Sequence, residues 1–204
     1  MSTNTNQLQF REDGCILIRN VRLSYPHLFK AWSKNPEKDK AKFSGRFLLG
    51  KKTHTAEIKA LKQYLAEMMQ EHFKGKIPLD KLFMRDGAGT AKPEQEDSWY
   101  IAASEDRKPE VIHRDPKIKI AEEDDIVYAG CFVNVLIRPW VQSNVHGKRI
   151  NANLLAVQFV KEGERFGAER PDTGEAFGDI SGDFEDDDGA GDASGFNDDD
   201  GAFD

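Results

Sequence analysis

The chain has 204 residues, 38% of them hydrophobic and 32% charged, which predicts one domain of ordinary size with a heavily solvated surface. No run approaches the roughly 18 consecutive apolar residues of a membrane span, and the first residues lack the pattern of a secretory signal. The two cysteines, Cys15 and Cys131, form neither a metal-spaced pair nor a disulfide framework. We therefore expect a protein of a reducing cytoplasm that has no membrane partner.

The formal net charge of −7 combines two parts of opposite sign. Residues 171–204 hold thirteen acidic residues and no Lys or Arg. Without these thirteen, 23 of the 36 acids remain against 29 bases, which leaves residues 1–170 with a net charge of +6. This asymmetry indicates a nucleic acid or another polyanion as partner. We divide the chain into a flexible N-terminus (1–14), a binding domain (15–170) and an acidic tail (171–204).

Alternating and β-branched segments bounded by turn residues predict a mainly β protein. We expect strands over residues 15–25, 42–49, 98–103, 110–113, 125–141 and 149–160. Pro26 is expected to end the first strand and Gly45 to bend the second, while Gly130 and Pro139 interrupt the long one. The last two strands predict a hairpin across residues 143–147, and residues 84–97 are interpreted as an exposed loop.

One helix is predicted over residues 55–73, inserted among the strands. Its Leu and Met residues recur at helical spacing, Thr55 is the expected cap, and Gly75 follows the last turn. We interpret the apolar stripe as packing on the core. The absence of βαβ alternation disfavours a doubly wound fold, and a partly open five-stranded barrel of the oligonucleotide-binding (OB) type fits the strand count.

Sequence signals of catalysis are weak. The chain has no GxxxxGK[ST] phosphate loop, and its five histidines form no HxxxH or HExxH set. We expect no catalytic residue, no metal site and no cofactor. Asp86, Asp115 and the acidic run 122–125 remain candidates for a Mg²⁺-dependent nuclease, but most acids lie in loops or the tail, where carboxylates are not held rigidly.

Aromatic and basic residues are interleaved in four places, and this pattern favours single-stranded nucleic acid. Unpaired bases stack on flat rings, while the phosphate backbone attracts cations. Lys42 and Arg46 share a strand face, which suits a groove that follows the backbone. The candidate DNA-binding residues are Tyr25, Phe29, Lys30, Trp32, Lys42, Phe43, Arg46, Trp99, Tyr100, Arg107, Lys108, Arg138, Trp140, Lys148 and Arg149.

Two readings of these clusters stay open. Trp32 and Trp140 are equally compatible with a stacking platform and with the core, whereas Phe47, Tyr128, Phe132 and Phe159 are expected in the core. The alternative to a binding groove is a solvated basic face.

The acidic tail is expected to be disordered, because its four isolated phenylalanines bury too little apolar surface to offset the entropy of ordering. A tethered polyanion competes for a basic groove at high effective concentration. The tail is therefore expected to suppress weak duplex binding and to yield to a single strand. Phe196, Phe203 and the terminal Asp204 are the candidate residues for docking on a protein partner. A purely solubilising tail is the alternative.

Four segments carry a resemblance to a known family: RNVRLSYPHLF (19–29), KFSGRFLLGKK (42–52), YAGCFVNVLIRPW (128–140) and NANLLAVQFVKEGERFG (151–167). Together they resemble the bacteriophage-encoded single-stranded DNA-binding proteins with an OB fold, over most of residues 15–167. The resemblance implies non-catalytic coating of single-stranded DNA during phage replication, recombination or repair in the cytoplasm of an infected bacterium. It also implies recruitment of replication proteins by the tail, although Asp204 stands where the commonest pattern ends on an aromatic residue.

Two other functional classes remain as alternatives. One is a small phage nuclease or recombination endonuclease that uses acidic residues and Mg²⁺. The other is an interaction module whose tail mimics nucleic acid and blocks a host protein. Weaker duplex binding and a homo-oligomeric state stay open within the main hypothesis.

Overall fold

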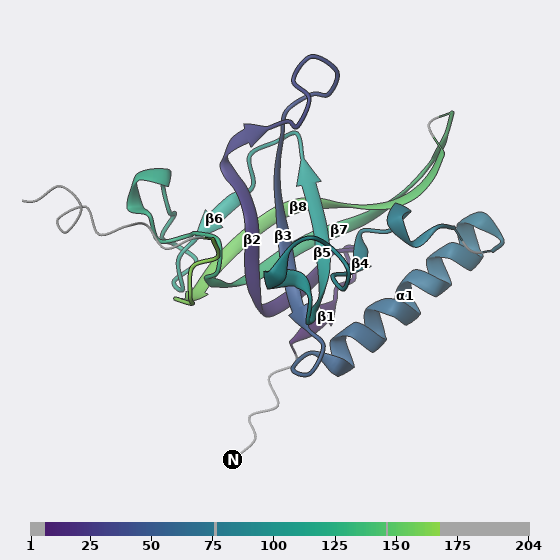
Figure 1. The fold of residues 1–204 in the computed structure, drawn as a ribbon, viewed down its shortest axis with the longest axis horizontal. Helices are drawn as coiled ribbons and strands as arrows, with labels where there is room; N and C mark the ends of the chain where they lie inside the picture. Colours follow the sequence, from purple (N-terminus) through teal and green to yellow (C-terminus); the bar gives the residue numbers. More distant parts are fainter. Residues whose placement is uncertain (1–6, 76, 146, 168–204) are drawn as a thin grey trace, which may run out of the picture. The chain divides into compact units, whose positions relative to one another are not determined.

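Eight strands form one sheet in the computed structural model of the chain, and helix α1 lies beside it (Figure 1). The structure describes residues 7–75, 77–145 and 147–167, so the acidic tail lies outside the described residues. Neighbouring strands follow the order β4-β5-β3-β2-β7-β8-β6, and β1 pairs with β2. The strands are β1 (Leu8–Phe10), β2 (Ile16–Trp32), β3 (Lys42–Gly50), β4 (Met84–Asp86), β5 (Ser98–Glu105), β6 (Glu110–Ile112), β7 (Phe132–Asn144) and β8 (Gly147–Lys161). Helix α1 is Thr55–Phe73, and three 3-10 turns are η1 (Leu79–Lys81), η2 (Pro93–Gln95) and η3 (Glu122–Asp124).

Five long strands confirm the mainly β class with one inserted helix. β5, β3, β2, β7 and β8 are hydrogen-bonded neighbours in that order. The strands β1, β4 and β6, of three residues each, bring the sheet to eight strands in place of the expected five-stranded barrel; of these three, β6 lies in the expected strand 110–113, whereas β1 and β4 were not expected. β5 also lies against β8 without being hydrogen-bonded to it, so the sheet is bent but not closed. β1 falls within residues 1–14, where the sequence indicated only flexible chain, and its Leu8 is buried.

The expected end of the first strand at Pro26 is wrong, because β2 continues to Trp32. Ser24 pairs with Arg46 and His27 with Ser44, so three steps along β2 match two steps along β3. The extra residue forms a β-bulge, and Tyr25 within it has a φ of +50°. A bulge accommodates proline because the missing N–H falls outside the regular ladder.

The long strand is also shifted relative to the sequence prediction. β7 begins at Phe132 and runs through Pro139, which pairs with Ala152, while residues 125–131 lie outside the strand. Beyond Ile137 the strand has lost its pairing with β2, so the missing N–H of Pro139 falls on a free edge. The predicted hairpin with β8 is confirmed. Residues 84–97 are not wholly loop, since they include β4 and η2.

Helix α1 has the predicted bounds, Thr55–Phe73. Ile58, Leu61 and Leu65 are buried on one face, which confirms that the apolar stripe packs on the core. The expected cap is wrong. His54 occupies the N-cap position without a side-chain cap hydrogen bond, and the Thr55 hydroxyl donates to the Lys51 carbonyl at 3.1 Å. No helix in the described part of the chain is long and apolar enough to cross a membrane.

The core lies within the bend of the sheet. Its centre is formed by residues of β2, β3, β5, β7 and β8 with no exposed surface: Val21, Leu23, Phe47, Leu49, Ile101, Val133, Val135, Ile150, Leu154 and Val157. Phe47 and Phe159 are buried as expected, whereas Tyr128 and Phe132 are half-buried. The two cysteines are free and buried. The interior therefore leaves one face of β3 and β5 for other roles.

Candidate nucleic-acid interface

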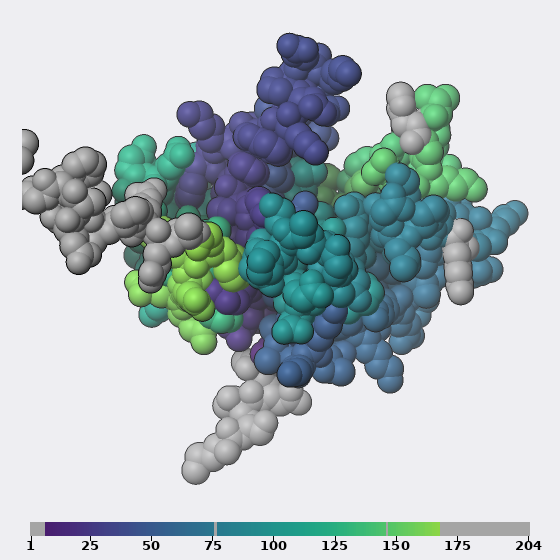
Figure 2. Space-filling model, viewed as in Figure 1, coloured from purple at the N-terminus to yellow at the C-terminus, as the bar shows by residue number. Residues whose placement is uncertain are grey.

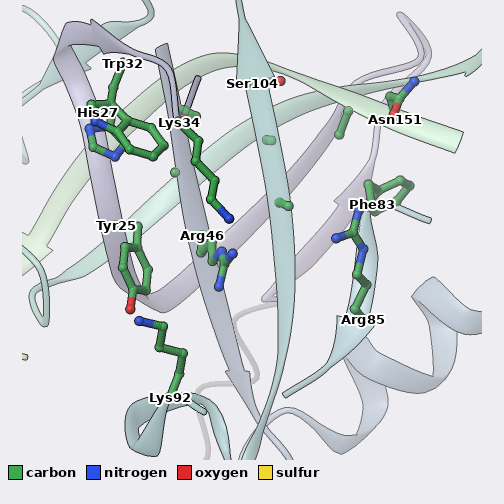
Figure 3. Close-up of a pocket in the computed structure, with 15 residues that line it drawn as sticks. Tyr25, His27, Trp32, Lys34, Arg46, Phe83, Arg85, Lys92, Ser104 and Asn151 are labelled. Carbon is green, nitrogen blue, oxygen red and sulfur yellow. The ribbon is translucent and has the colours of Figure 1, made fainter. Parts of the chain in front are cut away.

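A groove of about 670 Å³ lies over β3 and β5 (Figure 3). Ser44 pairs with Ser104 and Arg46 with Ala102, so these side chains share one face of the sheet. Serine and alanine are short, and they leave the floor of the groove low. The walls come from β2 and the segment after it, β4 and the residue before it, the loop before η2, and β8. They consist of Tyr25, His27, Trp32, Lys34, Phe83, Arg85, Lys92, Asn151 and Ala152.

Four cations line this groove: Lys34, Arg46, Arg85 and Lys92. None of them forms a salt bridge with a carboxylate among the residues that the structure describes. Figure 3 shows Lys92 beside Tyr25, Lys34 and Arg46 between β3 and β5, and Arg85 across β5 beside Phe83. Unneutralised cations that converge on a concave surface attract a polyanion. The groove therefore has the electrostatic character of a phosphate-binding surface.

The bulge in β2 brings Tyr25 to these cations. The Arg46 guanidinium carbon lies 5.0 Å from the centre of the Tyr25 ring and 5.1 Å from that of Tyr100. The Lys92 ammonium lies 5.0 Å from the Tyr25 ring. Bulges near functional sites commonly redirect one side chain, and a positive φ at a non-glycine residue often marks such a site. Tyr25 is 38% exposed, so its ring remains available to a ligand.

A second platform follows along β2. The Trp32 and His27 rings are stacked, with centres 4.9 Å apart and planes inclined by 7°. Trp32 is 52% exposed, so one face of this pair is open to solvent. Burial lowers the pKa of His27, which keeps the imidazole neutral at pH 7. The pair is therefore an uncharged, flat surface at the edge of a basic groove.

The β7–β8 hairpin extends the same surface. Trp140 pairs with Asn151, which lines the groove, and the neighbouring pairs Arg138–Asn153 and Gln142–Arg149 lie on the same side of the hairpin. Trp140 is 41% exposed. The surface is hollowed between the projecting segment 33–41 and the tip of this hairpin (Figure 2). Lys148, by contrast, turns toward α1, where its ammonium lies 5.6 Å from the Phe73 ring.

Some predicted residues lie away from the groove. Trp99 lies on the opposite face of β5 from Tyr100, under the Lys62 ammonium of α1 at 3.9 Å. Phe43 lies on the other face of β3 from Arg46, and Phe29 packs against the core. Tyr100 is only 6% exposed, so it supports Arg46 without presenting a free ring.

The predicted cations outside the groove differ in their surroundings. Lys42 shares the face of Arg46 but forms a 3.5 Å salt bridge with Asp106. Lys108 lies 5.5 Å from the Phe29 ring, and Lys30 and Arg107 are exposed. These residues lie at or just beyond the ends of β2, β3 and β5 next to residues 33–41, and they are not among the residues that line the groove. The structure thus brings together Tyr25, Trp32 and Arg46, with Arg138, Trp140 and Arg149 on the adjoining hairpin face.

Sequence reasoning missed the other half of the groove. Arg85 and Lys92 lie in the stretch interpreted as an exposed loop, and Asn151 carries no charge or ring. Tyr100, Ala102 and Ser104 alternate along β5 and share one face of the strand. The small side chains of Ala102 and Ser104 are the sequence signal that could have marked the floor of the groove. No local pattern places that face beside Tyr25, because the neighbourhood depends on strand pairing.

The chain matches known proteins over most of its length. The model of the family described as "Enterobacter phage Enc34, ssDNA-binding protein" matches residues 15–189. A solved structure of the single-stranded DNA-binding protein of bacteriophage Enc34 in complex with single-stranded DNA is 35% identical, with a TM-score of 0.72, and the match covers 81% of this chain and 97% of that one. Another structure of that protein is also 35% identical, with a TM-score of 0.70 over 86% of this chain and 97% of that one. Protein p50 of Acyrthosiphon pisum secondary endosymbiont phage 1 is 27% identical over 177 residues, which is 81% of this chain and 94% of p50.

Because Trp32 and Trp140 are exposed, we expect neither ring to contribute much to the free energy of unfolding. Trp32→Ala and Trp140→Ala are each expected to lower the free energy of unfolding by less than about 1.5 kcal/mol, the scale of one aromatic contact. Phe47→Ala, at a position with no exposed surface, is the matched control and is expected to cost about 3–5 kcal/mol. Urea denaturation measures all three. If either tryptophan variant lost as much unfolding free energy as Phe47→Ala, that tryptophan ring would belong to the core.

Proposed function

The chain belongs to the family of the Enterobacter phage Enc34 ssDNA-binding protein, and we therefore propose that it binds single-stranded DNA without catalysis. The observation that carries this proposal is the groove over β3 and β5, where exposed rings stand beside cations that have no carboxylate partner in the described residues. The related protein of bacteriophage Enc34 has been solved in complex with single-stranded DNA. We propose the same ligand for this groove.

The groove chemistry explains a preference for single strands. Arg46, Lys92 and their neighbours neutralise phosphates, while Tyr25 and Trp32 offer rings on which bases stack. A base stacks only when it is unpaired, so a duplex gains the electrostatic part of the binding energy and loses the stacking part. Stacking requires no particular base, which makes binding largely independent of sequence. Coating of single strands during phage DNA replication, recombination or repair, in the host cytoplasm, is the role that these properties serve.

The nuclease alternative receives no support from the carboxylates that suggested it. Asp86 forms a 2.7 Å salt bridge with Lys51, and Asp115 accepts a hydrogen bond from the backbone N–H of Lys117. Asp125 is paired with Arg165 at 3.0 Å. Among residues 7–75, 77–145 and 147–167, no group of three or more His, Cys, Asp or Glu side chains is placed to hold a metal ion.

The acidic tail completes the proposal. Its thirteen carboxylates are covalently tethered to a domain whose groove is basic, so they compete with DNA at a high effective concentration. Duplex binding lacks the stacking contribution and is the weaker interaction, so the tail suppresses it more than single-strand binding. Phe196, Phe203 and Asp204 are proposed to recruit replication or recombination proteins, and these residues lie outside the described part of the chain.

Salt dependence tests the groove directly. If the four groove cations each neutralise one phosphate, log K for a single strand is expected to fall with log salt at a slope of about −3, at roughly −0.7 per phosphate. Fluorescence anisotropy with labelled strands of different sequence, between 50 and ~300 mM salt, measures the slope and the sequence dependence. Incubation with Mg²⁺ is the control, in which the strand stays intact. A flat salt response would contradict the basic groove, and cleavage would restore the nuclease alternative.

The stacking contribution is tested at the two exposed tryptophans. Trp32→Ala and Trp140→Ala are each expected to weaken single-strand binding by about 1–3 kcal/mol, because each removes a platform for one base. Trp32→Phe and Trp140→Phe, which keep an aromatic face, are the matched controls and are expected to retain most of the affinity. The salt slope stays unchanged in all four variants, since no charge is altered. Wild-type affinity in the alanine variants would remove that ring from the interface.

Deletion of residues 171–204 tests the role of the tail. The deletion changes the net charge from −7 to +6. It is expected to raise the affinity for single-stranded DNA and, by a larger factor, the affinity for duplex DNA. Association rates at low salt should also rise, because the Debye length reaches about 30 Å at 0.01 M. A full-length variant with the thirteen acids changed to Asn or Gln is the matched control and should reproduce the deletion. Equal affinities of full-length and truncated protein at low salt would contradict the competition.

A further inference from the structure

Gln95 is a polar residue with no exposed surface directly behind the groove. It is the last residue of η2, and its side-chain oxygen Oε1 accepts a hydrogen bond from Nη1 of Arg46 at 3.2 Å. The Arg46 guanidinium is thus held from three directions, by the Tyr25 ring, the Tyr100 ring and the Gln95 amide. Of these neighbours, the amide is the one that fixes a particular N–H of the guanidinium.

The other end of the Gln95 amide has an unfavourable environment. Its Nε2 is buried and has no hydrogen-bond partner in the described residues. Reversing the amide would turn Nε2 toward Arg46, where two donors would face each other, so Arg46 determines the orientation. An apolar side chain of similar length would avoid the unpaired N–H. The amide therefore destabilises the fold slightly, and its one visible contribution is the contact with Arg46.

The seat of Gln95 is tightly built. Gly87 approaches so closely that a Cβ at this position would lie 2.0 Å from the Gln95 carbonyl oxygen and 2.7 Å from that of Ser98. The Gly87 N–H donates to the Ser98 carbonyl at 2.9 Å, which continues the pairing of β4 and β5 into the loop. The Gln95 N–H donates to the Lys92 carbonyl at 3.0 Å, so the same turn carries Lys92 to the Tyr25 ring.

We propose that Gln95 is a positioning residue of the DNA groove, which holds the Arg46 guanidinium in the orientation that receives a phosphate. An arginine on a free side chain loses rotamer freedom when it binds, whereas one already held by an amide and two rings loses less. This inference rests on the proposed function. It adds that the Gln95 amide preorganises Arg46 for phosphate binding. It also assigns a role to the segment 87–98, which carries Lys92 and Gln95. The sequence analysis interpreted this segment, up to residue 97, as an exposed loop.

Gln95→Met tests this role because methionine has similar length and no hydrogen-bonding amide. Single-strand affinity at fixed salt is expected to fall by about three- to tenfold, the size of a typical coupling between contacting residues. The salt slope is expected to stay at the wild-type value, because no charge changes. Unfolding stability is expected to stay equal or to rise, since the unpaired N–H is removed. A purely structural role predicts the opposite, a loss of stability together with affinity.

A double-mutant cycle with Arg46→Ala isolates the contact. Arg46→Ala alone should weaken binding and reduce the salt slope by about 0.7. Adding Gln95→Met to Arg46→Ala should then change affinity no further, because the residue it positions is absent. Gly87→Ala, which displaces the Gln95 backbone, should weaken binding with the slope preserved, and Gly75→Ala, where a Cβ meets nothing within 4 Å, is its control.

The outcomes separate the two proposals. Failure of the wild-type protein to bind single-stranded DNA would overturn the proposed function itself. Wild-type binding with an unchanged affinity in Gln95→Met would overturn the positioning role alone. Additive effects of Gln95→Met and Arg46→Ala would overturn it as well, because they would show that Gln95 acts independently of Arg46.

Discussion

The β-bulge at Tyr25 in strand β2 is the constraint on which the binding surface depends. Without the extra residue, β2 would keep its alternation, and the ring of Tyr25 would not stand beside Arg46. The bulge carries an unfavourable positive φ at a bulky residue, and it permits a proline at the next position. Local strain is retained because the strand must both fill the core through Leu23 and deliver Tyr25 and Trp32 to the surface.

The division of charge follows from the same arrangement. Several surface cations away from the groove, such as Lys40 and Lys51, are paired with carboxylates. In the groove, Arg46 is instead held by two rings and the Gln95 amide, and Lys92 lies over the Tyr25 ring, and these contacts orient a charge without neutralising it. Among the described residues that line the groove none is a carboxylate, whereas residues 171–204 hold thirteen, and we propose this tail as a displaceable competitor for the groove.

Much of the fold follows from local pattern, and the site follows only in part. The period of two in β3 and the helical spacing in α1 are local properties, so the elements and their buried faces were predictable. Pro26 and Pro139 were misread because their effect depends on whether a neighbouring strand needs the missing N–H, which is a tertiary property. The basic-aromatic clusters contain Tyr25, Trp32 and Arg46, which the structure places in the groove. Lys92 lines the groove and Gln95 lies behind it through the packing of a segment that has no regular sequence pattern.

Photocrosslinking tests the central claim most directly. A single strand substituted with 5-bromodeoxyuridine is irradiated on the full-length protein, and the adducts are located by peptide mass spectrometry. The account predicts adducts on the peptides that contain Tyr25 and Trp32 and on the β7–β8 hairpin peptide that contains Trp140. Adducts confined to Trp99 and helix α1, on the opposite face of β5, would contradict it.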